Sequence, residues 1–159
     1  RQRLNILDRQ ALKITDIQDV IEQMGPLDGA TEFLAWLRER CQVIILSDTF
    51  YQFAQPLMRQ LGFPTLFCNQ LEIDASGRIV NYHMRMQDPK KHAVAALKSL
   101  NFLTMAAGDS YNDTAMLGEA HAGFFYCPPE HLPKEFPQFP VTQTYGALQE
   151  RFAKAGQLQ

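Results

Sequence analysis

Gly108-Asp109-Ser110-Tyr111-Asn112-Asp113 is the stretch of sequence that decides the predicted fold. It follows the apolar run from Leu103 to Ala107 and precedes a helical pattern from Asp113 to Ala120. A buried strand that ends in Gly-Asp and turns into a helix places carboxylates at the carboxyl edge of a sheet, where open α/β sheets bind ligands. Two carboxylates and an amide within one turn suit Mg²⁺, which prefers oxygen ligands. An ordinary strand-to-helix turn would use the same residues, because Asp, Asn and Gly are common in turns.

Strand and helix patterns alternate along most of the remaining chain. Short apolar runs typical of buried strands occupy residues 42–46, 103–107 and 122–126. Amphipathic or capped helices are predicted between and after them, over residues 28–40, 51–61, 89–100 and 145–154. This order predicts an α/β fold in which a parallel sheet carries helices on both faces.

Two segments depart from this alternation. Residues 1–26 read as helices, and we expect them to form a partial cap, with the core over residues 27–159. Within the core, the alternating residues on either side of Ala75-Ser76-Gly77 predict a β-hairpin at 70–86. Residues 65–68 are expected to form a separate parallel strand.

Composition excludes several classes of function. The chain has 159 residues, of which 46% are hydrophobic and 20% charged, and its net charge is −2. This balance gives no reason to expect nucleic acid or a membrane surface as a partner. No apolar run approaches a membrane span and no signal peptide is visible, so a cytoplasmic protein is expected. Three cysteines without CxxC spacing predict free thiols rather than a metal site.

Polar residues with phosphate chemistry follow the predicted strands. Ser47-Asp48-Thr49 ends the strand at 42–46, and Lys90 and Lys91 lie in the first turn of the helix at 89–100. A hydroxyl, an ammonium group and a cation held by carboxylates are what a transferring phosphoryl group needs. A solvated lysine at a helix start is the plainer interpretation of either lysine taken alone.

The order of these motifs resembles the haloacid-dehalogenase superfamily of phosphatases. The stretches ILSDTFY, DPKK and AAGDSYNDTAML are similar to those of phosphoserine phosphatases, and of the bacterial branch that also passes phosphate to homoserine. The resemblance covers essentially the whole chain and implies a Rossmann-like core, Mg²⁺ as cofactor and phosphoserine as substrate. Water or homoserine would accept the phosphoryl group. The oligomeric state is not set by the sequence, and a homodimer is compatible with it.

The resemblance also implies a role for each matching residue. Ser47 and the neighbourhood of Asp48 would bind the phosphate, and Asn112 would contact substrate or phosphate. Lys90, rather than Lys91, would neutralise the phosphoryl charge, and Asp109 would bind Mg²⁺. Asp113 would hold the metal shell or the lysine. Arg3 would grip the carboxylate of phosphoserine, although an exposed helical arginine is an equally good interpretation.

One family motif is absent from the sequence. The Asp-x-Asp pair that ends the family's first, central strand would supply the nucleophile, and these 159 residues contain no such pair. The chain also begins at Arg1 without a methionine. We therefore expect the central strand to be missing and this chain alone to be inactive, with an engineered or processed start as the alternative. Without this strand, the two strands that flank it would each have an edge of unpaired main-chain N–H and C=O groups, unless the two edges joined or another segment took the place of the missing strand.

Two hypotheses follow. In the first, the full-length parent is a magnesium-dependent phosphoserine phosphatase with an upstream nucleophilic Asp. In the second, the protein is a catalytically dead homologue that binds phosphorylated ligands or a protein partner. A dinucleotide-binding domain is disfavoured because no GxGxxG follows the first strand.

Overall fold

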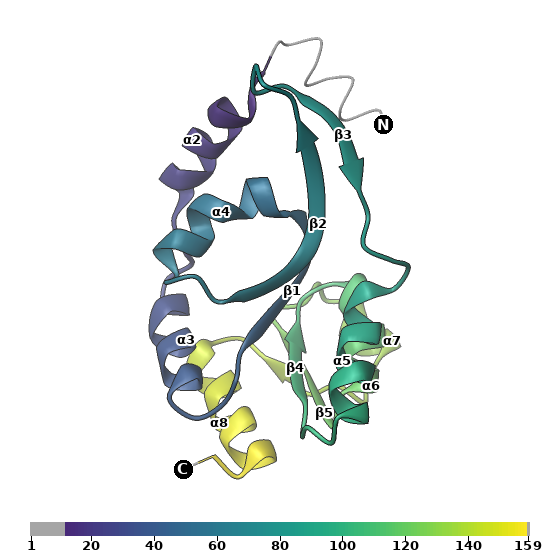
Figure 1. Cartoon of the computed structure of the whole chain (residues 1–159). Helices are drawn as coiled ribbons and strands as arrows, with labels where there is room; N and C mark the ends of the chain where they lie inside the picture. Colours follow the sequence, from purple (N-terminus) through teal and green to yellow (C-terminus); the bar gives the residue numbers. More distant parts are fainter. Residues whose placement is uncertain (1–11, 159) are drawn as a thin grey trace. The chain divides into compact units, whose positions relative to one another are not determined.

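The computed structural model describes residues 12–158 and divides into two compact units (Figure 1). The first unit consists of the described residues up to Leu34 together with Gln42–Met86. The second consists of Ala35–Cys41 and the described residues from Gln87 onward. Each unit has its own three-stranded sheet and its own helices. The predicted α/β fold with parallel strands is confirmed, and its strands form two sheets rather than one.

The sheet of the first unit is mixed. Its order is β1-β2-β3, formed by β1 (Ile44–Phe50), β2 (Thr65–Ile73) and β3 (Ile79–His83). Strand β1 runs parallel to β2, whereas β3 is antiparallel to β2. Helix α4 (Tyr51–Gln60) follows β1 directly, and α2 (Ile14–Met24) packs beside α4 (Figure 1).

Strand β2 differs from the prediction of two separate strands. Residues 65–68 and the first arm of the hairpin are one continuous strand, which pairs with β1 near its beginning and with β3 near its end. The sequence separates the two halves at Asn69-Gln70, because two polar residues interrupt the apolar run. Asn69 is nevertheless buried, and its amide is hydrogen-bonded, so the polar pair does not end the strand.

Strand β1 continues through the polar residues that were expected to end it. Leu46 pairs with Phe67 and Phe50 pairs with Asn69, so three residues of β1 (Ser47, Asp48 and Thr49) stand opposite one residue of β2 (Cys68). This arrangement is a β-bulge, which releases residues from the regular ladder and redirects their side chains. The apolar residues before the bulge, 44–46, are half-buried, although a strand buried on both faces was expected.

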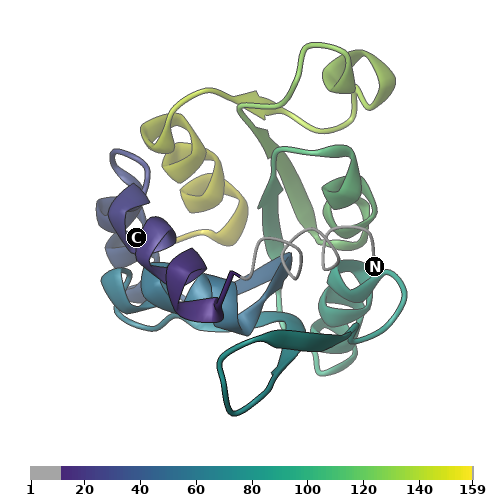
Figure 2. The same cartoon turned by 90° about the horizontal axis from the view of Figure 1, so that it is seen from above.

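The sheet of the second unit is entirely parallel. Its order is β4-β5-β6, formed by β4 (Met105–Gly108), β5 (Ala122–Tyr126) and β6 (Val141–Thr142). Helices α5 (Pro89–Ser99) and α6 (Thr114–Glu119) lie on one face and α8 (Tyr145–Gly156) on the other, as Figures 1 and 2 both show. The remaining helical elements are α3 (Ala30–Arg38), which spans both units in sequence, the 3₁₀ turn η1 (Tyr111–Asp113) and α7 (Leu132–Glu135).

The core of the second unit lies between this sheet and its helices. Four apolar side chains there are at most 2% exposed: Leu117, Phe125, Leu132 and Leu148. Because β4 and β5 are parallel, the residues that follow them emerge at the same edge of the sheet. The turn Gly108–Asp113 leaves β4 at that edge. None of the helices in the described part of the chain has the length and hydropathy needed to cross a lipid bilayer.

Candidate functional site

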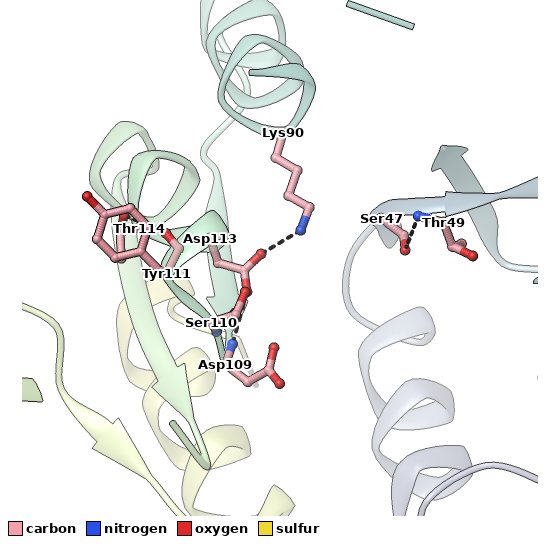
Figure 3. Close-up of polar contacts among 8 residues, drawn as sticks. All are labelled: Ser47, Thr49, Lys90, Asp109, Ser110, Tyr111, Asp113 and Thr114. Carbon is pink, nitrogen blue, oxygen red and sulfur yellow. Dashed lines mark hydrogen bonds and ion pairs between the residues drawn. The ribbon is translucent and has the colours of Figure 1, made fainter. Parts of the chain in front are cut away.

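Asp113 organises the turn that follows β4. Its Oδ2 atom accepts hydrogen bonds from the Asp109 N–H at 3.1 Å, the Ser110 N–H at 3.1 Å and the Ser110 hydroxyl at 2.9 Å (Figure 3). These donors lie at the start of a helical segment, where N–H groups have no partner within the helix. The carboxylate therefore fixes the path of the turn while remaining buried.

The second oxygen of the same carboxylate binds Lys90. The distance from Lys90 Nζ to Asp113 Oδ1 is 2.8 Å, and the two side chains are only 13% and 7% exposed. Burial is the largest single influence on the pKa of Asp113 and acts to raise it. The Lys90 ammonium and the Ser110 donors together outweigh burial and hold the pKa of Asp113 below its usual value. The Asp113 carboxylate is therefore charged at neutral pH.

Gly108 is required by the closeness of this carboxylate. A Cβ atom at position 108 would lie 2.4 Å from Asp113 Cβ, 2.6 Å from Cγ and 2.7 Å from Oδ2. These separations are well inside van der Waals contact, and the Asp113 side chain has no room to retreat because all its partners are in place. Only glycine lets the end of β4 pass so close to the buried carboxylate.

Asp109 offers a carboxylate of a different kind. It is exposed, and no donor among the described residues lies within hydrogen-bonding distance of its side-chain oxygens. Its oxygens are therefore available to a cation. Across residues 12–158, no three His, Cys, Asp or Glu side chains converge into a metal-binding group. This donor set fits Mg²⁺, which commonly keeps several waters and takes only one or two protein carboxylates.

A second cluster of polar groups lies at the β1 bulge in the first unit. The Thr49 N–H donates to Ser47 Oγ at 3.3 Å (Figure 3). The Asp48 carbonyl oxygen accepts from Asn69 Nδ2 at 3.0 Å. Ser47 is half-buried and Asp48 is exposed. A serine hydroxyl beside main-chain N–H groups is a common arrangement for binding an anion.

The predicted site residues thus fall into three groups. The second unit brings Lys90, Asp109 and Asp113 together, with Asn112 exposed in the same turn. Ser47 and Asp48 belong to the first unit, and their meeting with the second group at one site stays a prediction. Arg3 lies outside the described residues.

Two residues that support these clusters were not predicted from the sequence. Ser110 donates to Asp113 through both its N–H and its hydroxyl. A serine three residues before an acidic residue at a helix start is a known capping pattern, and that signal would have found it. Asn69 gave no such signal, because its partners lie 21 residues before it and 16 after it.

Known proteins that are similar to this chain identify its family. The family model of haloacid dehalogenase-like hydrolases matches residues 1–121. The chain therefore belongs to the haloacid dehalogenase-like hydrolase family. It is 61% identical over 155 residues to the phosphoserine phosphatase ThrH of Pseudomonas aeruginosa, covering 98% of this chain and 76% of that protein.

One further relative and one solved structure are also similar to this chain. A phosphoserine phosphatase of Pseudomonas syringae pv. tomato is 57% identical over 98% of this chain, which spans 65% of that protein. A solved structure described as a phospho-aspartyl intermediate analogue of phosphoserine phosphatase matches with a TM-score of 0.67 and 22% identity. That match covers 82% of this chain and 64% of the solved chain, and at this identity it supports the fold alone.

Proposed function

We propose that the protein to which this chain belongs is a magnesium-dependent phosphoserine phosphatase. The observation that carries the proposal is the buried Lys90–Asp113 ion pair at 2.8 Å, set beside the exposed carboxylate of Asp109 in one turn. Such a pair holds an ammonium group in a fixed position, where it can neutralise charge on a phosphoryl group. Phosphoserine as the substrate rests on the relatives, which carry that activity in their names.

Each cluster has a separate task in this proposal. Lys90 stabilises the negative charge of the transferring phosphoryl group, and Asp113 positions Lys90 without touching the substrate. Ser47 and the N–H groups of the bulge bind phosphoryl oxygens, and Asn112 contacts substrate or phosphate. Asp109 holds Mg²⁺, which when bound would neutralise phosphate charge as a Lewis acid.

The nucleophile is the part of the mechanism that these residues do not supply. The sequence contains no Asp-x-Asp pair, so we propose that an Asp outside these 159 residues attacks phosphorus. An O–P bond forms to that carboxylate, the P–O ester bond breaks, and the serine oxygen leaves and takes up a proton. Water then attacks phosphorus, releasing inorganic phosphate and restoring the carboxylate. Homoserine could replace water, its hydroxyl losing a proton as its O–P bond forms. The chain alone is accordingly expected to be inactive, because the first central strand would carry that Asp.

The test is phosphate release from phosphoserine in the presence of Mg²⁺, measured on the product of the complete reading frame. Replacing Lys90 by Ala is expected to lower the rate about 10²–10³-fold, the usual effect of removing one group that stabilises the transition state. Lys91→Ala is the matched control, since Lys91 is an exposed neighbour on the same helix. Release no faster than that of Lys90→Ala would refute the proposal and favour a homologue that binds without turnover.

A further inference from the structure

Asn69 is the least exposed polar side chain in the described part of the chain, at 1%. Both ends of its amide are used. Nδ2 donates to the Asp48 carbonyl at 3.0 Å, and Oδ1 accepts from the Arg85 N–H at 3.1 Å. Because one partner can only accept and the other can only donate, the orientation of the amide is fixed.

The contact with Asp48 determines the direction of the Thr49 N–H as well as the position of the Asp48 carbonyl. In a trans peptide group the C=O of one residue and the N–H of the next point in opposite directions within one plane. The carbonyl of Asp48 and the N–H of Thr49 belong to the same peptide group, and the described chain contains no cis peptide bond. By holding the carbonyl, Asn69 therefore directs the Thr49 N–H to the other side, toward Ser47 Oγ.

The bulge is the place where such a hold is needed. Ser47, Asp48 and Thr49 stand opposite a single residue of β2, so the regular ladder does not fix their peptide groups. Asn69 is the residue of β2 that pairs with Phe50, immediately after the bulge. Its side chain thus replaces a ladder hydrogen bond at the point where the ladder is interrupted.

We propose that Asn69 is a positioning residue of the phosphate-binding bulge. It sets the Asp48–Thr49 peptide group so that the Thr49 N–H donates to Ser47 Oγ and orients the Ser47 hydroxyl to donate to a phosphoryl oxygen. This inference rests on the proposed function, because it assigns the bulge to phosphate. Asn69 itself touches neither substrate nor metal.

The second contact of Asn69 strengthens its hold on the bulge. The Arg85 N–H fixes Oδ1 from the chain segment that follows β3. Arg85 is itself anchored, since its guanidinium group lies 4.8 Å from the centre of the Phe67 ring. The amide cannot rotate away from Asp48 without losing this bond inside a buried site.

The chain offers a matched pair of variants for the test. Asn69→Asp keeps an oxygen for the Arg85 N–H but places a second oxygen against the Asp48 carbonyl. Gln52→Glu makes the same chemical change elsewhere in this unit, because Gln52 accepts from the Leu71 N–H and donates to the Leu71 carbonyl, both at 2.9 Å. Both variants lose one donor to a main-chain carbonyl, and only the first one acts on the bulge.

Binding of inorganic phosphate with Mg²⁺ is followed through the Thr49 amide resonance of the complete protein. Asn69→Asp is expected to shift that resonance in the free protein and to weaken phosphate binding about tenfold, the loss of one hydrogen bond to a charged group. Gln52→Glu is expected to leave the resonance and the affinity as in the wild type.

Three results would overturn the inference. The first is an unchanged phosphate affinity in Asn69→Asp, and the second is an equal loss of phosphate affinity in both variants. The third is a Thr49 amide resonance that does not shift when phosphate binds to the wild type. If Asn69→Asp fails to fold, the test is made on the wild type. The scalar coupling across the hydrogen bond from Asn69 Nδ2 to the Asp48 carbonyl is measured, and absence of this coupling refutes the inference. Its presence, with a phosphate-dependent Thr49 shift, supports it. Phosphoserine turnover is measured in parallel, so that absent turnover with intact phosphate binding refutes the proposed function alone.

Discussion

The turn after β4 and the bulge in β1 place polar groups at strand ends in opposite ways. In the turn, one buried carboxylate receives three hydrogen bonds on one oxygen and an ammonium group on the other. In the bulge, the side chain of the strand itself makes one long contact, at 3.3 Å, and a buried amide from the neighbouring strand holds the main chain.

This difference separates two ways of building a site. Asp113 supports the fold through one oxygen and the candidate chemistry through the other oxygen of the same carboxylate, so any change there should affect both. Ser47 contributes little to the fold, because the bulge is held by Asn69 rather than by Ser47. Substitutions in the turn should therefore cost stability, whereas substitutions of Ser47 should cost function alone.

The largest effect is expected from Lys90→Met. Removing one partner of a buried ion pair leaves a buried charge without its counter-ion, which costs about 3–5 kcal/mol of folding free energy. Lys98→Met is the matched control. The ion pair of Lys98 with Glu119 is 2.9 Å long, close to the 2.8 Å of Lys90–Asp113, but its two side chains are 34% and 25% exposed. The control should lose about 1 kcal/mol or less. Urea unfolding measures both, and equal losses would contradict the assignment of Asp113 as the centre of the turn.

A smaller effect is expected from Gly108→Ala. The new methyl group would lie 2.4–2.7 Å from three atoms of Asp113, and overpacking of this kind costs about 1–3 kcal/mol. Gly118→Ala is its counterpart in α6, where the added methyl would meet Phe139 at an ordinary 3.7 Å. That variant should gain up to about 1 kcal/mol from the lower entropy of its unfolded chain. Thermal unfolding of the two variants distinguishes a crowded turn from a general sensitivity to added volume.

Acid is expected to produce a graded loss of stability through Asp113. The pKa of this carboxyl is lower in the folded protein than the value of about 3.9 in unfolded chains. Its contribution is therefore complete above that unfolded value and is lost as the pH falls through the lower, folded value. Unfolding between pH 6 and pH 2 should show this loss, and Asp113→Asn should remove that part of the pH dependence.

The pKa of Asp113 should rise when Lys90 is absent. In Lys90→Met, the ammonium group that lowers the pKa of Asp113 is lost while burial still raises it, so this pKa should be higher than in the wild type. Lowering the pH from 7 to 2 should then narrow the difference in the free energy of unfolding between this variant and the wild type, because the wild type loses the larger contribution from Asp113. A gap that stays constant with pH would show that Lys90 does not determine the charge state of Asp113.

Much of the turn could be predicted from the sequence because its signals are local. The apolar run, the Gly-Asp step and the helical pattern lie within 18 residues, from Leu103 to Ala120, and the structure has β4, η1 and α6 there. Helix α5, with Pro89 in its first turn, was found for the same reason.

The bulge could not be predicted because its determinants are far apart in the sequence. The polar run at 47–49 suggested the end of a strand, and the polar pair at 69–70 suggested a break between strands. Each interruption is compatible with a strand only because Asn69 and Asp48 satisfy one another across 21 residues. A single sequence carries no trace of that pairing.

The smallest effect on stability is expected from Ser47→Ala, and this variant tests the comparison most directly. Because Ser47 Oγ accepts a single 3.3 Å hydrogen bond, the free energy of unfolding should change by no more than about 0.5 kcal/mol. Affinity for phosphate should fall about tenfold, since a hydroxyl that binds a charged oxygen is lost. Ser76→Ala, which removes a 2.6 Å hydrogen bond to Asp74 in an exposed turn, should leave phosphate binding unchanged. A Ser47 variant that loses stability as Lys90→Met does would show that the bulge, like the turn, is held by the residue that serves the chemistry.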